Sequence, residues 1–82
     1  MRAVAKAKRL NPIKRKQMEE RARELEQEIG RTETAIAQHE TALQSFVSAE
    51  ETARLTQELD AHRTALQKRL IEWEELTATL QG

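Results

Sequence analysis

Apolar side chains recur along this chain at alternating steps of four and three residues, and this spacing constrains the fold more than any other feature. The first series holds Met18, Ala22, Leu25, Ile29, Thr32, Ile36, His39, Leu43 and Phe46. The second holds Leu55, Leu59, His62, Leu66, Leu70, Trp73, Leu76 and Leu80, with a small drift at Arg69-Leu70. A period of 3.5 residues indicates helices that pack in a coiled coil along this apolar seam.

Two capping signals divide the periodic stretch into two helices. Asn11-Pro12 marks a start, because Asn can accept from the free N–H groups and Pro fits the first turn. Ser48-Ala49-Glu50-Glu51 is a capping box, with its acids where the helix dipole favours them. The sequence predicts a helix over about 12–45, a turn at 46–48 and a helix over about 49–81.

The predicted fold class is all-α. Residues 12–82 form a two-helix antiparallel coiled-coil hairpin, because the connection is short, and residues 1–11 form a basic N-terminal extension. The alternative is one continuous helix that dimerises in trans, but a capping box has no purpose in an unbroken helix. We expect a monomer. Folding at the turn pairs Ile36 with Leu59, Ile29 with Leu66, Leu25 with Leu70, Ala22 with Trp73, and Met18 with Leu76.

Polar side chains occupy three seam positions. In the predicted register Thr32 and His62 share a layer, and His39 lies near Leu55, several layers from His62. We interpret them as partly exposed or register-fixing groups, because a polar group on a seam can fix register at a cost in stability. A pH switch or a metal site is the alternative, although no partner stands at ligand spacing. Trp73 is expected to pack in the core rather than to anchor an interface.

Composition limits the chemistry that this chain can perform. It has no Cys, which excludes disulfides and thiolate sites, and its two glycines, Gly30 and Gly82, are too far apart for a phosphate-binding loop. No run is long and apolar enough for a signal peptide or a membrane span. A two-helix hairpin also lacks a catalytic pocket. We therefore expect a cytoplasmic binding protein that is not an enzyme and holds no metal or cofactor.

The net charge of zero hides an uneven distribution. Residues 1–16 hold seven basic side chains and no acid, whereas residues 17–82 hold the other seven and all 14 acids. Basic clusters bind phosphate backbones largely through counterion release, and a soluble, flexible tail is the alternative interpretation. No aromatic side chain accompanies the cluster, so we expect any nucleic-acid contact to be independent of base sequence.

Several short motifs support a family resemblance. They are Leu10-Asn11-Pro12-Ile13-Lys14, Gln17-Met18, Glu24-Leu25-Glu26 and Ile71-Glu72-Trp73-Glu74-Glu75-Leu76. Together with the basic start and the short break, they make nearly the whole chain similar to the C-terminal domain of Uup-like ABC-F ATPases. These proteins carry two nucleotide-binding cassettes and no transmembrane domain.

The resemblance implies properties that periodicity does not. The chain would be a fragment of a longer ATPase whose ATP and Mg²⁺ sites lie in the missing cassettes. ABC-F proteins act on ribosomes, and the Uup-like C-terminal domain is associated with DNA binding. The resemblance therefore implies contact with DNA, rRNA or tRNA through phosphates. The residues expected to make this contact are Lys8, Arg9, Lys14, Arg15, Lys16, Arg21 and Arg23. The alternative function is a protein-interaction or spacer coiled coil with no nucleic-acid role.

Overall fold

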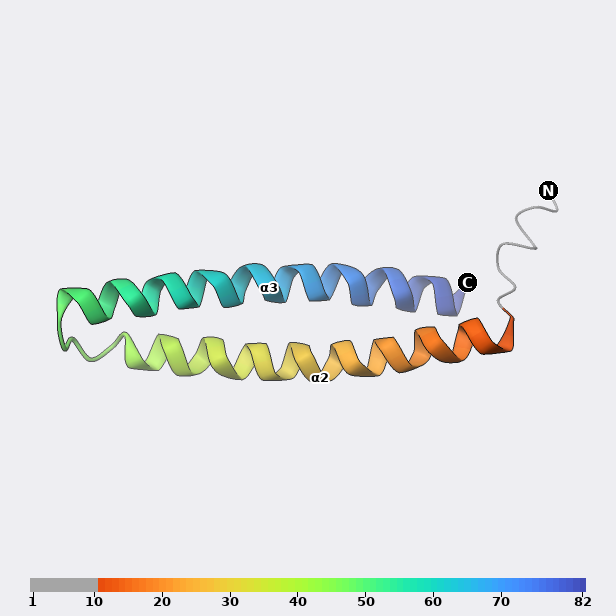
Figure 1. Cartoon of the computed structure of the whole chain (residues 1–82), viewed down its shortest axis with the longest axis horizontal. Coiled ribbons are helices and arrows are strands. Elements are labelled where there is room, and N and C mark those ends of the chain that lie inside the picture. The colour runs from red at the N-terminus through yellow and green to blue at the C-terminus, as the bar shows by residue number, and fades with distance from the viewer. Residues whose placement is uncertain (1–10) are drawn as a thin grey trace.

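The computed structural model describes residues 11–82, which form two long helices and no strand. Helix α2 spans Pro12–Ala42, and helix α3 spans Ala49–Gln81. The helices run antiparallel, side by side, in a rod with extents of 62 × 21 × 14 Å (Figure 1). The all-α two-helix hairpin predicted from the seam is confirmed. Most of the predicted basic extension, residues 1–10, lies outside the described residues.

Both predicted helix starts are confirmed in atomic detail. The Asn11 side-chain oxygen accepts a 2.7 Å hydrogen bond from the backbone N–H of Lys14, and Pro12 occupies the first turn of α2. The Ser48 hydroxyl accepts a 3.0 Å bond from the N–H of Glu51. Each cap satisfies a backbone donor that has no partner within its helix. The two caps therefore fix where α2 and α3 begin.

Helix α2 ends at Ala42, short of the predicted end near Ser45. The N–H of Leu43 still donates to the carbonyl of His39, but the N–H of Ser45 donates to the carbonyl of Ala42, which tightens the last turn. The connection between the helices is therefore longer than the predicted turn. Phe46, the last residue of the first seam series, leaves the interface and is 76% exposed.

The core between the helices is thin. Leu25 is completely buried, and Ala22, Leu59 and Thr32 are nearly so. The Thr32 hydroxyl is satisfied by a 2.7 Å bond to the carbonyl of Glu28. Two helices can bury only one stripe each, so the remaining seam residues stay partly open to solvent. The fold consequently depends on a few apolar contacts together with the ion pairs that flank them.

The register differs from the predicted one. Within α3 the half-buried and buried positions keep the four–three spacing without drift, so Arg69 lies on the seam and Leu70 is 37% exposed. The guanidinium of Arg69 reaches the Thr32 hydroxyl at 3.2 Å, where the predicted register placed His62. The helices are thus displaced by about one layer relative to the predicted register. The predicted Leu25–Leu70 pairing is replaced by a packing in which Leu70 lies at the edge.

Candidate nucleic-acid interface

The basic start of α2 lies at one end of the rod. Of the residues expected to contact phosphate, Lys8 and Arg9 lie outside the described residues, whereas Lys14, Arg15 and Lys16 occupy the first turns of α2. Figure 1 shows that α2 extends past the end of α3 here. The first turn of α2 contains no acid. The positive pole of the helix dipole therefore lies beside the basic side chains at this end of the rod.

Arg15 is held by the opposite helix. Its Nη2 donates a 2.8 Å hydrogen bond to the carbonyl oxygen of Leu80, and its Nε lies 3.5 Å from a Glu19 carboxylate oxygen. The last turn of α3 has no basic residue of its own. Arg15 thus places a cation at the negative end of α3 and satisfies a free carbonyl there. This role was not predicted from the sequence, although an antiparallel hairpin always brings the start of one helix to the end of the other.

Arg21 is neutralised by carboxylates. Its Nε and Nη2 donate to the two oxygens of Glu72 at 2.8 and 3.0 Å, a bidentate pair across the helices, and Nη1 lies 3.4 Å from Glu24 and 3.5 Å from Glu28. The hydrogen bond to Glu72 is the main cause that raises the pKa of Arg21, and the same bond lowers the pKa of Glu72. Arg21 therefore links the two helices. Because neighbouring carboxylates neutralise its charge, it is a weak contact for an external phosphate.

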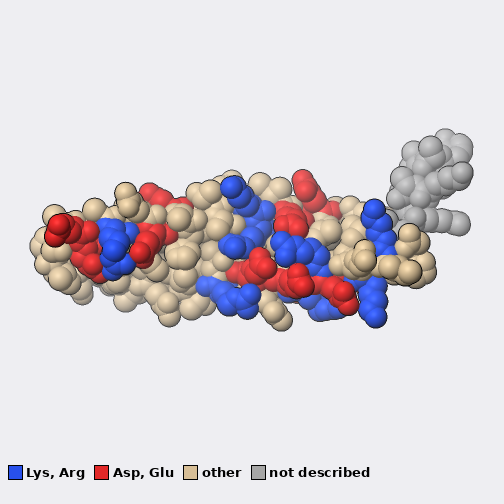
Figure 2. Space-filling model, in the orientation of Figure 1, with Lys and Arg blue, Asp and Glu red and all other residues tan. Residues whose placement is uncertain are grey.

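Three of the expected residues remain available. Lys14, Lys16 and Arg23 are exposed and make no ion pair within residues 11–82. Lys16 and Arg23 are two turns apart, so they project from the same face of α2. Arg31 and Lys68, which were not among the predicted contact residues, are also exposed and make no ion pair in the described part of the chain. Figure 2 shows basic groups over the middle of the rod as well as at its basic end.

The opposite end of the hairpin is acidic. Between Ile36 and Ala53 the chain contains Glu40, Glu50 and Glu51 but no Lys or Arg. The first Arg of α3, Arg54, is paired with both Glu51 and Glu58. Like charges repel, so this end would repel a nucleic-acid backbone.

The two histidines are in contact across the interface. The prediction that they lie several layers apart is therefore wrong. The rings of His39 and His62 form an edge-to-face pair with centroids 5.0 Å apart. The displaced register is the reason. Nδ1 of His39 lies 2.7 Å from the carbonyl of Ala35, and Nε2 lies 2.9 Å from a Glu58 oxygen. Both neighbours are acceptors, so the geometry favours a ring with a proton on each nitrogen, and the bond to Glu58 raises the pKa of His39.

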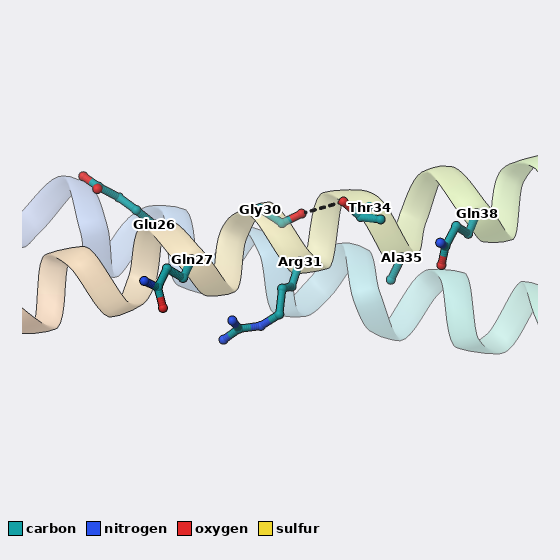
Figure 3. A pocket seen from close by; sticks show the side chains of 7 residues that line it. All are labelled: Glu26, Gln27, Gly30, Arg31, Thr34, Ala35 and Gln38. Atoms are coloured by element: carbon teal, nitrogen blue, oxygen red, sulfur yellow. Dashed lines mark hydrogen bonds between the residues drawn. The ribbon is translucent and has the colours of Figure 1, made fainter.

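The described surface also contains open hollows. One on α2 is lined by Glu26, Gln27, Gly30, Arg31, Thr34, Ala35 and Gln38. Figure 3 shows that Glu26 points to one side of the helix and that Gln27 and Arg31 point to the other. The one interaction drawn there is the 3.0 Å bond from the Thr34 hydroxyl to the carbonyl of Gly30. These side chains do not converge on a common point, as the groups of a catalytic or ligand site would.

Trp73 lies at the edge of the interface. It is half-buried, and its indole N–H donates a 3.0 Å hydrogen bond to a Glu26 oxygen. Together with Ile29 and Leu70, these two side chains line a small hollow. Residues 11–82 contain no cluster of three or more acidic or histidine side chains that could hold a metal ion. Within the same residues, neither helix has the length and apolar character needed to cross a membrane.

No family model, no curated protein and no solved structure matches this chain.

Proposed function

We propose that this chain is a non-catalytic coiled-coil arm that binds DNA or structured RNA through phosphates at its basic end. The observation that carries this proposal is the distribution of unpaired cations. Lys14, Lys16 and Arg23 gather at the start of α2, and the acidic tip lies at the far end of the 62 Å rod. Binding at one end fits an arm that leaves its other end free.

The proposed contact is electrostatic and reads no base sequence. Lysine binds phosphate as a point charge, and the released counterions make the affinity dependent on salt. Helix α2, which carries these cations, has no Phe, Tyr or Trp on which a base could stack. Arg15 and Arg21 support the contact indirectly, because their bonds to Leu80 and Glu72 hold α2 against α3.

A wider assignment rests on the family resemblance. We propose that the arm is the C-terminal domain of a Uup-like cytoplasmic ABC-F ATPase, whose cassettes would hold ATP and Mg²⁺ and whose partner could be a ribosome. The motifs around Pro12 and Trp73 support this. It predicts that the gene encodes two nucleotide-binding cassettes upstream of Met1 in the same reading frame. A stop codon in that frame, with no cassettes before this segment, would contradict it.

The experiment is a titration of the chain into a labelled DNA duplex and a labelled RNA hairpin at two salt concentrations, followed by fluorescence anisotropy and amide NMR shifts. We expect binding that weakens steeply with salt and amide shifts centred on the start of α2. The triple variant Lys14→Glu/Lys16→Glu/Arg23→Glu should abolish binding and leave the far-UV circular dichroism unchanged, because these side chains are exposed and make no ion pair within residues 11–82.

The matched control is Lys68→Glu, which reverses an exposed, unpaired charge in the middle of α3. It should reduce the affinity far less than the triple variant does. Binding that is indifferent to salt, or that survives the triple variant, would show that the basic end is not a phosphate site. A chain that does not bind either nucleic acid would favour the alternative function, a protein-interaction or spacer hairpin.

A further inference from the structure

The tip of the hairpin exposes two adjacent apolar side chains. Phe46 is 76% exposed and Val47 is 75% exposed, and Phe46 is one of only two aromatic residues in the chain. Single exposed apolar residues are common on protein surfaces. Here an aromatic and a β-branched side chain are adjacent and form one exposed apolar patch at the end of the rod. Neither side chain contributes to the core that holds the helices together.

The connection is anchored by hydrogen bonds on both sides of these two side chains. The N–H groups of Leu43, Gln44 and Ser45 are bonded to carbonyls of the last turn of α2, and the Ser48 hydroxyl caps α3. The connection contains no Gly or Pro, and no residue in the described part of the chain has a positive φ. A connection that is anchored on both sides loses less conformational entropy than a free loop when its side chains enter a pocket.

The charges around the tip select the kind of partner. Glu40 is paired with Arg63, and Glu51 is paired with Arg54, but Glu50 is exposed and makes no ion pair within residues 11–82. At the tip end of Figure 2 the extreme surface is uncharged, and acidic groups lie just behind it. Nucleic acid and anionic lipid would be repelled, and a second acidic tip would be repelled as well. A basic surface would be attracted.

We propose that the tip is a protein-docking knob, in which Phe46 and Val47 enter an apolar pocket of a partner protein whose rim carries Lys or Arg opposite Glu50. The apolar pair supplies the buried centre of this interface, and Glu50 supplies the charged rim. This site is separate from the basic end of the rod, so it does not depend on whether the basic end binds nucleic acid.

The test is site-specific photocrosslinking within the full protein in the cells that make it. The photoreactive residue p-benzoylphenylalanine replaces Phe46 in one strain and Ile71 in a second. Ile71 is an exposed apolar residue on α3 and serves as the matched position away from the tip. Mass spectrometry then identifies each adduct and the peptide that carries it. A third strain combines the position 46 probe with Glu50→Lys, and a fourth combines it with Glu33→Lys, an exposed acid remote from the tip.

We expect adducts with one protein from position 46 but not from position 71, attached at an apolar pocket beside basic residues. Glu50→Lys should reduce their yield several-fold, and Glu33→Lys should not. Adducts with a second copy of the chain, with nucleic acid or with lipid would overturn the proposal, as would equal yields from positions 46 and 71. An absence of adducts, or a yield that does not change with Glu50→Lys, would overturn it as well. The far-UV spectrum and melting temperature of each purified variant show that the hairpin is intact.

Discussion

At the scale of single residues, the partners of each charged side chain decide what it can do. Arg15, Arg21 and Arg69 look like surface cations in the sequence, yet each is bonded to the facing helix. Lys14 and Lys16 have no such partner in the described chain. The sequence could identify the basic cluster, but it could not separate structural from available cations, because that division depends on which side chain of the other helix lies opposite.

The His39 contacts predict that the stability of the hairpin depends on pH. Its pKa is raised in the folded state, chiefly by the hydrogen bond to Glu58 and less by that to the Ala35 carbonyl, whereas Arg54 opposes the shift. The facing His62 ring is the other titratable group in contact. The stabilisation is therefore complete below the unfolded pKa of about 6.5 and is lost as the pH rises through the higher folded value. Melting temperatures should fall between pH 6 and pH 8.

The replacement His39→Gln should remove most of this pH dependence, because the glutamine does not titrate. His62→Gln is the control and should retain the dependence, since the bond between His39 and Glu58 remains. A melting temperature of the unchanged protein that is flat or rises over this range would contradict the assignment. The reverse trend belongs to Glu58, whose pKa is lowered chiefly by His39, so its share of stability is lost only in more acidic solution.

At the scale of helices, the caps and the seam were readable from the sequence, but the end of α2 and the register were not. Asn11 and Ser48 mark starts because their side chains bond locally, which involves neighbours in the chain alone. No Gly or Pro marks the end of α2, so that boundary depends on how the connection packs. Leu70 is more apolar than Arg69 and was therefore assigned to the seam. The long Arg69 side chain can instead cover apolar surface while its guanidinium reaches Glu28 at 3.1 Å.

Gly30 allows a test of whether the low helix propensity of glycine reduces the stability of α2. It lies in the middle of the helix, is exposed, and an added Cβ would meet no atom within 4 Å. Gly30→Ala should stabilise the hairpin by about 0.5–1 kcal/mol, because alanine loses less backbone entropy on folding. Urea unfolding followed by circular dichroism would measure the change. A loss of stability would mean that the added methyl group meets a neighbouring atom, contrary to the open space seen at this position.

At the scale of the whole molecule, a rod of two helices buries few side chains, so the loss of one strongly affects its stability. Only Leu25 is fully buried within residues 11–82. Leu25→Ala should cost about 2–5 kcal/mol, which is comparable with the whole stability of a small domain. Both helices should then lose structure together, because most helical stability in proteins comes from packing.

The measurement is far-UV circular dichroism with temperature, and Ile71→Ala is the matched control. Ile71 is about half exposed on α3, so its truncation should change the midpoint far less. If Leu25→Ala melts like the unchanged protein, Leu25 is not the central packing contact that its complete burial indicates. If α2 and α3 unfold in separate steps, the two helices do not stabilise each other as the structure indicates.

Because α3 returns to the end where α2 begins, the length of the helices sets the distance between the two ends of the hairpin. Asn11 and Gly82 lie at the same end, and the knob formed by Phe46 and Val47 lies at the other (Figure 1). The reach of the arm is therefore set by the number of seven-residue repeats in each helix. Adding one repeat to both helices would move the knob outward by about 10 Å and leave its direction nearly unchanged. Evolution could thus adjust how far this arm extends without redesigning either of its ends.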